Sequence, residues 1–206
     1  MARVPRADGS YVVVLDMGGV LYDFQGAALI ARASRRARRW RSEEVRAHWA
    51  KLLLGFETGT SSETAFAESI VERFELTLAP DEFLLAFRNA AVGFYEGALS
   101  LVAELRQRHR VVSLSNTNAV QWPKVLSDLG PSDPFHAHHP SHVSGFHKPD
   151  LRAFHGTRGE WSDASGVHFF DDRSENVAAA LRFGWHAQRV RGVAETRAAC
   201  SRAGLI

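Results

Sequence analysis

The feature that most constrains this fold is an alternation of short β-branched runs with amphipathic helical patterns. The β-branched runs occupy residues 11–15, 110–115, 167–170 and, more weakly, 186–190. Helical patterns follow in "ALSLVAELRQRH", "AVQWPKVLSDLG" and "NVAAALRFG", and the last two end at a glycine, a common helix terminator. Alternation of this kind predicts an α/β fold, in which a parallel sheet is covered by helices.

Residues 25–93 have helical spacing and show no strand pattern. Large apolar residues recur there every three or four positions, at Val45, Trp49, Leu52, Leu53, Phe56, Phe66, Ile70 and Phe74. Thr60 and Glu63 fit a capping box, and Pro80 fits the start of a further helix. We interpret the Trp49 stripe as hydrophobic core rather than as a ligand pocket.

These two patterns predict a Rossmann-like parallel-sheet core with an inserted all-helical cap domain. The core would comprise residues 1–23 and 94–206, and the cap residues 24–93, with crossings near Phe24 and Phe94. The polar turn at 56–62, which Gly55 and Gly59 bracket, would lie at the cleft between them.

Composition narrows the functional classes. The 206 residues are 45% hydrophobic and 23% charged, which is typical of a globular protein, and the net charge of +2 gives no argument for nucleic acid. No apolar stretch is long enough to span a membrane, and the N-terminal segment does not resemble a signal peptide. The single cysteine, Cys200, favours a reducing, cytoplasmic location. Nothing in the sequence predicts the oligomeric state.

Polar side chains follow the predicted strands where those strands end. They are Asp16, Ser115, Asn116, Asp171 and Asp172, and Lys148 lies in a loop between two strands. Because ligands gather at the carboxyl ends of parallel strands, these groups are expected to converge. Carboxylates can hold Mg²⁺, one of them can attack phosphorus, and a lysine and a hydroxyl can neutralise phosphoryl oxygens. Gly18 and Gly19 would let the backbone approach the same oxygens.

Four segments in this order resemble the motifs of the haloacid dehalogenase-like hydrolases, most of which are phosphatases. The segments are "LDMGGVL", "VVSLSNTN", "HKPD" and "FFDDRSENVAAA", so the resemblance runs from about residue 11 to 190. The helical segment falls where that superfamily carries its small cap. In detail the motifs look closest to those of bacterial phosphatases that act on glucose 1-phosphate.

The resemblance implies a role for each of these residues. Asp16 would be the nucleophile and, with the Gly18 carbonyl and Asp172, a magnesium ligand. The phosphoryl group would be bound by Gly18, Gly19, Ser115, Asn116 and Lys148, and Lys148 would also contact Asp16. Asp171 and Asn176 would support the site, with Asp171 orienting Lys148 or a metal-bound water. The implied function is Mg²⁺-dependent hydrolysis of a small phosphorylated metabolite, possibly a sugar phosphate, through an aspartyl-phosphate.

The sequence departs from the family's pattern at one position, and this keeps other functions open. Many members of the family carry an acid two residues after the nucleophile, and here that residue is Gly18; Asp23 is the nearest spare carboxylate. One alternative is a dehalogenase, which needs no metal and so has no use for the Asp171–Asp172 pair. The other is a catalytically weak binding or regulatory protein.

Two further clusters are interpreted without chemistry. The histidines between His136 and His142 alternate as on a strand, so we expect a strand or surface position rather than a metal site. The arginines from Arg32 to Arg41 are expected to form a solvated helix face.

Overall fold

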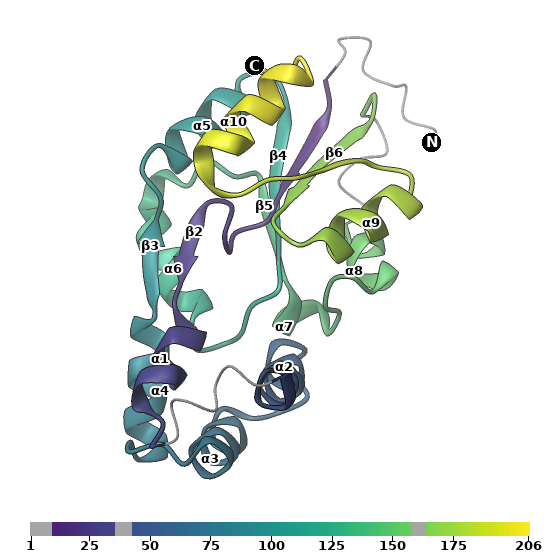
Figure 1. The fold of residues 1–206 in the computed structure, drawn as a ribbon. Coiled ribbons are helices and arrows are strands. Elements are labelled where there is room, and N and C mark those ends of the chain that lie inside the picture. The colour runs from purple at the N-terminus through teal and green to yellow at the C-terminus, as the bar shows by residue number, and fades with distance from the viewer. Residues whose placement is uncertain (1–9, 36–42, 158–163) are drawn as a thin grey trace.

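Five parallel strands form the central sheet of the protein, in the order β5–β4–β1–β6–β7 (Figure 1). The computed structural model describes residues 10–35, 43–157 and 164–206. The strands are β1 (Val12–Leu15), β4 (Arg110–Ser115), β5 (Ala137–Pro140), β6 (Val167–Asp171) and β7 (His186–Arg189). In β1, Val12 pairs with Arg110 of β4 and Val167 of β6, so β1 lies at the centre of the sheet.

Helices cover both faces of the sheet because both faces of β1 are apolar. Val13 and Leu15 pack toward α5 (Ala98–Arg106), α6 (Trp122–Leu129) and α10 (Gly192–Arg202). Val12 and Val14 pack toward α8 (Leu151–His155) and α9 (Ser174–Arg182). Two short elements, η2 (Gly130–Ser132) and α7 (Ser141–Ser144), flank β5. The fold is therefore the predicted Rossmann-like α/β sheet.

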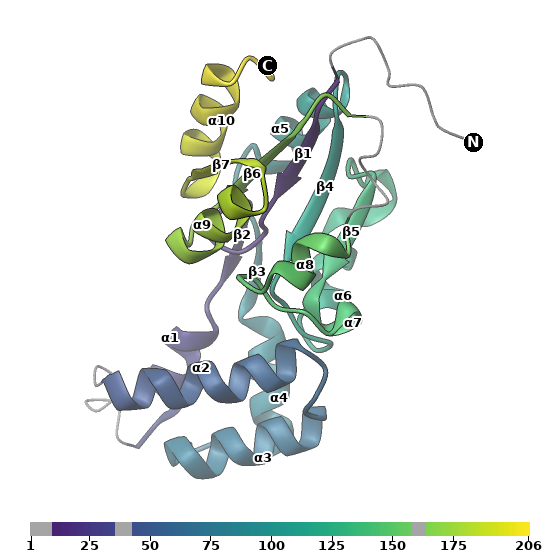
Figure 2. The same cartoon turned by 90° about the vertical axis from the view of Figure 1, so that its right-hand side faces the viewer.

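Four helices form a separate layer facing the carboxyl ends of the strands (Figures 1 and 2). They are α1 (Gly26–Ala33), α2 (Glu43–Glu57), α3 (Glu63–Phe74) and α4 (Pro80–Asn89), and we refer to them as the helical insertion. The insertion has its own core, built largely from aromatic rings such as Phe56, Phe66 and Phe83. Phe56 and Phe66 stack with their ring centroids 4.3 Å apart.

A two-stranded antiparallel ribbon joins the insertion to the sheet, and it corrects one expectation. We expected no strand between residues 25 and 93, yet β3 (Ala91–Phe94) begins at Ala91 and pairs with β2 (Tyr22–Phe24). The ribbon stays separate from the main sheet. Its pairing is long-range, so the local sequence of either strand carries little signal for it.

The cap of α3 is a second correction. Ser62, not Thr60, begins this helix, and its hydroxyl accepts a hydrogen bond from the Ala65 amide at 3.2 Å. The Thr60 hydroxyl instead donates to the Gly55 carbonyl at 2.9 Å. The predicted Thr60–Glu63 capping box is therefore wrong, because Thr60 closes the preceding turn.

Two further predictions concerned a membrane-spanning helix and the run of arginines. In the part of the chain that the structure describes, no helix is long and apolar enough to cross a membrane. Most of the arginine run lies at residues 36–42, outside the described residues.

Candidate active site

Lys148 is the centre of a buried charge cluster at the carboxyl end of the sheet. Its side chain is 1% exposed, and its ammonium donates to the Leu114 carbonyl at 2.6 Å. The same nitrogen lies 2.9 Å from Asp16 Oδ1 and 2.7 Å from Asp171 Oδ2. Burial alone would lower the pKa of Lys148, but the two carboxylates raise it, so Lys148 is a cation at neutral pH. The structure thus joins three of the predicted residues in one network.

Asp16 follows β1 and is held by its neighbours on one oxygen. Oδ1 accepts from the Met17 amide at 2.8 Å and from Lys148, which leaves Oδ2 unclaimed by the described part of the chain. Burial raises the pKa of Asp16, the Lys148 ammonium opposes this, and the charges of Asp171 and Asp172 raise it further. The carboxylate is oriented, and its second oxygen is available for chemistry.

Asp171 and Asp172 are adjacent in sequence but differ in surroundings. Asp171 is fully buried; Oδ2 accepts from Lys148, Oδ1 from the Arg173 amide at 2.9 Å, and the Asn176 amide group contacts both oxygens at 3.0 Å. Asp172 is partly exposed and lines a pocket that is described below. Burial raises the pKa of Asp172, and the Asp171 charge raises it further. The hydrogen bonds of Asp171 are therefore all made within the protein, whereas Asp172 faces the pocket.

The donor set fits a hard divalent cation. One carboxylate oxygen from each of Asp16, Asp171 and Asp172 lies within 4.8 Å of the others. Asn176 Oδ1 is buried with no hydrogen-bond partner among the described residues, although its amide faces this cluster. Mg²⁺ prefers oxygen ligands, and its charge would relieve the repulsion among these carboxylates.

The backbone and its surroundings require a glycine at residue 19 but not at residue 18. Gly19 has φ +71°, and a Cβ there would lie 2.8 Å from Asp172 Oδ2, so any side chain would displace that carboxylate. Gly18 does not have a positive φ. A Cβ added there would lie 3.4 Å from the Phe24 ring, which is an ordinary van der Waals contact. The absence of an acid at residue 18 is therefore not forced by space.

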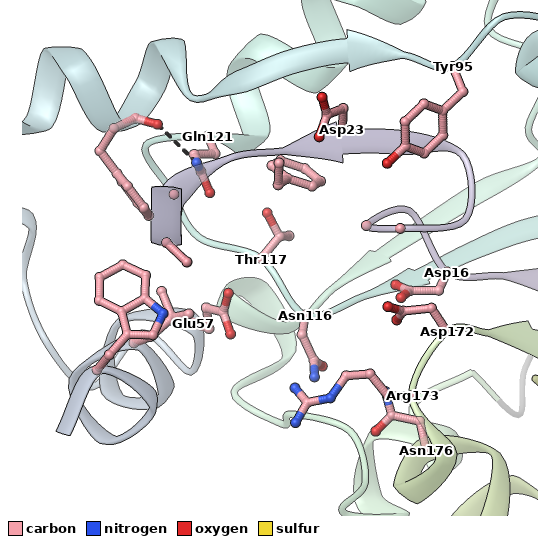
Figure 3. Close-up of a pocket in the computed structure, with 18 residues that line it drawn as sticks. Asp16, Asp23, Glu57, Tyr95, Asn116, Thr117, Gln121, Asp172, Arg173 and Asn176 are labelled. Carbon is pink, nitrogen blue, oxygen red and sulfur yellow. Dashed lines mark hydrogen bonds between the residues drawn. The ribbon is translucent and has the colours of Figure 1, made fainter. Parts of the chain in front are cut away.

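A pocket of about 540 Å³ opens between the sheet and the helical insertion. The predicted residues in its lining are Asp16, Gly18, Gly19, Asn116, Asp172 and Asn176 (Figure 3). Ser115, Lys148 and Asp171 lie beneath it, buried. Asp23 also lines the pocket, on β2.

Trp49 and Leu53 line the pocket from α2, which refines our interpretation of that stripe as core. Trp49 also packs against Phe66 and Phe87, with ring centroids about 6 Å away. One ring therefore serves both the insertion core and the pocket wall. The predicted cleft turn at 56–62 places its first polar residue, Glu57, in the same lining.

Two roles of Asn116 and Glu57 escaped the sequence analysis. The Asn116 amide brackets the Lys148 backbone: Oδ1 accepts from its N–H at 2.8 Å, and Nδ2 donates to its carbonyl at 2.9 Å. Asn116 Nδ2 also lies 3.2 Å from His147 Nδ1, and His147 Nε2 is 2.9 Å from Glu57 Oε2. A chain of contacts therefore links the insertion to Lys148. Partners 90 residues apart leave no local sequence signal.

The histidine cluster contains a serine–histidine–aspartate arrangement that is structural. His138 Nδ1 lies 2.7 Å from the Ser113 hydroxyl and Nε2 lies 2.7 Å from Asp133 Oδ2. Ser113 is fully buried inside β4, so no substrate reaches its hydroxyl. β5 covers residues 137–140, which agrees with the strand interpretation. Among the described residues the only candidate metal cluster is the aspartate group above.

The comparisons with known proteins agree with this geometry. The chain matches the haloacid dehalogenase-like hydrolase family over residues 12–184 and belongs to that family. A comparison with curated protein sequences finds no match.

Several solved structures share the fold. The HAD family enzyme BT-2542 from Bacteroides thetaiotaomicron, in complex with magnesium and inorganic phosphate, has a TM-score of 0.73 and 22% identity, covering 89% of this chain and 95% of its own. A predicted HAD-like hydrolase from Porphyromonas gingivalis has a TM-score of 0.63 and 21% identity over 89% and 92%. The L-2-haloacid dehalogenase from Xanthobacter autotrophicus has a TM-score of 0.59 and 24% identity over 88% and 77%.

Proposed function

We propose that this hydrolase is a Mg²⁺-dependent phosphatase acting on a small phosphorylated metabolite, with a sugar phosphate as one candidate. The observation that carries the proposal is the pairing of one oriented, pocket-lining carboxylate, Asp16, with a second one, Asp172, that has no ion pair with a cation of the described residues. The magnesium-and-phosphate complex of BT-2542 supports the same class of chemistry.

Each residue then has a defined task. Asp16 Oδ2 attacks phosphorus while Lys148 holds Oδ1. The leaving oxygen departs with the electron pair of the broken P–O bond and takes a proton from a pocket water, which gives an aspartyl-phosphate and the free alcohol. Lys148, Ser115 and backbone amides near Gly19 and Asn116 offset charge on the phosphoryl oxygens. Water then hydrolyses the aspartyl-phosphate and restores Asp16.

Magnesium would be held by Asp16, Asp172 and the Gly18 carbonyl, and it would offset the negative charge of the phosphoryl group. Asp171 contacts Lys148, and Asn176 contacts Asp171, so both would support the site by holding Lys148 in place. Residues 24–93 would form the cap and residues 1–23 and 94–206 the core; Trp49, Leu53 and Glu57 are among the residues that the cap would contribute to the pocket.

The charges in the pocket favour the phosphatase hypothesis over the dehalogenase hypothesis. A 2-haloacid carries a carboxylate, and the described residues of the lining include four carboxylates but only one cation, Arg173. That guanidinium already contacts Glu175, at 2.8 Å through Nε.

Hydrolysis of p-nitrophenyl phosphate and of 2-chloropropionate, each with and without Mg²⁺, separates the candidates. We expect release of p-nitrophenol only with Mg²⁺ and no chloride release. Metal-independent chloride release would establish a dehalogenase instead. No turnover of either compound would favour the remaining candidate, a catalytically weak binding or regulatory protein.

A further inference from the structure

The wall of the pocket opposite Asp16 carries a carboxylate that the chemistry at phosphorus does not use. Glu57 is the last residue of α2, is only 9% exposed and lines the pocket. Trp49, Leu53 and Glu57 recur every four residues, so one face of α2 presents an indole, an aliphatic side chain and a carboxylate to the same space. Figure 3 shows Glu57 across the pocket from Asp16 and Asp172.

Glu57 is fixed in place but retains hydrogen-bonding capacity. With Asn116 Nδ2 donating to His147 Nδ1, the His147 ring carries its proton on Nε2 and donates it to Glu57 Oε2 at 2.9 Å. An ionised carboxylate has about four acceptor sites, and His147 uses one of them, so a residue that lines the pocket retains acceptor sites for a ligand. Acceptors held this way bind hydroxyl hydrogens and repel anions.

Thr117 is a second, independent sign of a hydroxyl-bearing ligand. Its side-chain oxygen is buried and has no hydrogen-bond partner among the described residues, although the residue is only 2% exposed and lines the pocket. Figure 3 shows Thr117 in the pocket wall, between Gln121 and Asn116. A buried hydroxyl without a partner is costly, and a ligand hydroxyl would supply one.

The charges of this wall exclude a second anion. Asp23 adds another carboxylate from β2, and the guanidinium of Arg173, the one cation in the described lining, is paired with Glu175. Trp49 and Leu53 contribute apolar surface of the kind that packs against the C–H groups of a sugar ring.

We infer that Glu57 and Thr117 form a subsite for a neutral, polyhydroxylated leaving group, which selects monophosphates of sugars or polyols over substrates that carry an additional anionic group. The inference rests on the proposed phosphatase function and specifies its substrate class. Glu57 is here a specificity-determining residue, held by His147.

Competition against p-nitrophenyl phosphate hydrolysis tests the subsite. Glucose 6-phosphate and 6-phosphogluconate share a carbon chain and a phosphate but differ at C1, where the second compound carries a carboxylate. We expect the wild-type inhibition constant for glucose 6-phosphate to be at least about tenfold lower, despite its smaller charge. Glu57→Gln should shrink that ratio to less than about threefold. The exposed Glu43, on the same helix, gives the matched control Glu43→Gln, which should keep the wild-type ratio.

A second variant keeps the test independent of how Glu57→Gln folds. Thr117→Val removes the hydroxyl and preserves shape, so glucose 6-phosphate inhibition should weaken about threefold to tenfold, while inhibition by inorganic phosphate stays within about twofold. Tighter wild-type inhibition by 6-phosphogluconate, a ratio unchanged by Glu57→Gln, or no inhibition by either sugar compound would overturn the subsite. Absence of any p-nitrophenyl phosphate hydrolysis would instead overturn the proposed function, and the subsite with it.

Discussion

At the scale of single residues, two neighbouring aspartates have separate tasks. Asp171 accepts from Lys148, from Asn176 and from the Arg173 amide, and it is inaccessible, whereas Asp172 is partly exposed in the pocket. The family resemblance predicted that Asp171 orients Lys148 and that Asp172 binds the metal; the contact of Asp171 with Lys148 agrees with the first role, and the second stays a prediction. The distinction follows from the alternation of β6, which turns one side chain under the sheet end and the next outward.

Exchanging each aspartate for asparagine separates stability from metal binding. Asp171→Asn should lower the free energy of unfolding by about 3 kcal/mol, because it removes one partner of a buried ion pair. Asp172→Asn should change it by less than about 1 kcal/mol, because it removes a like-charge repulsion, yet it should raise the Mg²⁺ concentration needed for half-maximal activity at least about tenfold. Urea unfolding and Mg²⁺ titration of activity provide both measurements. A reversed pattern would exchange the two roles.

At the scale of elements, the strands that follow local patterns were predictable and those that depend on partners were not. β1 and β4 are runs of β-branched residues, and their positions were predicted to within one residue. β5 was visible only as alternating histidines. The β2–β3 ribbon depends on pairing between distant segments, as in Tyr22 with Phe94, which are 72 residues apart and separated by the four helices of the insertion. Of the candidate site, the motif residues and the cleft turn that contains Glu57 were predictable. The contact of Glu57 with His147 and the lack of a partner for the Thr117 hydroxyl among the described residues were not, because side-chain partners far apart in the chain leave no local signal.

β6 also carries a pH-dependent contribution to stability. His168 stacks on His186 of β7, with centroids 5.0 Å apart, and burial together with the His186 charge lowers the pKa of His168 to about 4. Its unfolded pKa is about 6.5, so the unfolded chain takes up this proton first. The stabilisation is complete above about pH 6.5 and is lost as the pH falls toward about 4.

Replacing this histidine should remove part of that pH dependence. We expect the wild-type free energy of unfolding to fall by about 1–2 kcal/mol more than that of His168→Gln between pH 7 and pH 4.5, a figure reduced for the partial exposure of the ring. Urea unfolding at several pH values measures the difference. Parallel curves for the two proteins would show that His168 does not carry the effect.

At the scale of the whole molecule, the sheet supplies the reactive groups and the helical insertion supplies the opposite wall of the pocket. Asp16, Lys148 and Asp172 all lie at the carboxyl ends of strands or in the loops that follow them, whereas Trp49 and Glu57 come from α2. The contact between Glu57 and His147, next to Lys148, joins the two layers. Under the proposed function, chemistry and substrate selection would be assigned to different parts of one chain.

The most direct test of this account is to trap the covalent intermediate on Asp16. The protein would be mixed with excess p-nitrophenyl phosphate and Mg²⁺, quenched in acid during turnover, digested and examined by mass spectrometry. We predict a gain of about 80 Da, one phosphoryl group, on the peptide that contains Asp16, and no such gain without Mg²⁺ or in Asp16→Asn. Full turnover with no phosphoryl group on Asp16, or undiminished hydrolysis by Asp16→Asn, would contradict the account.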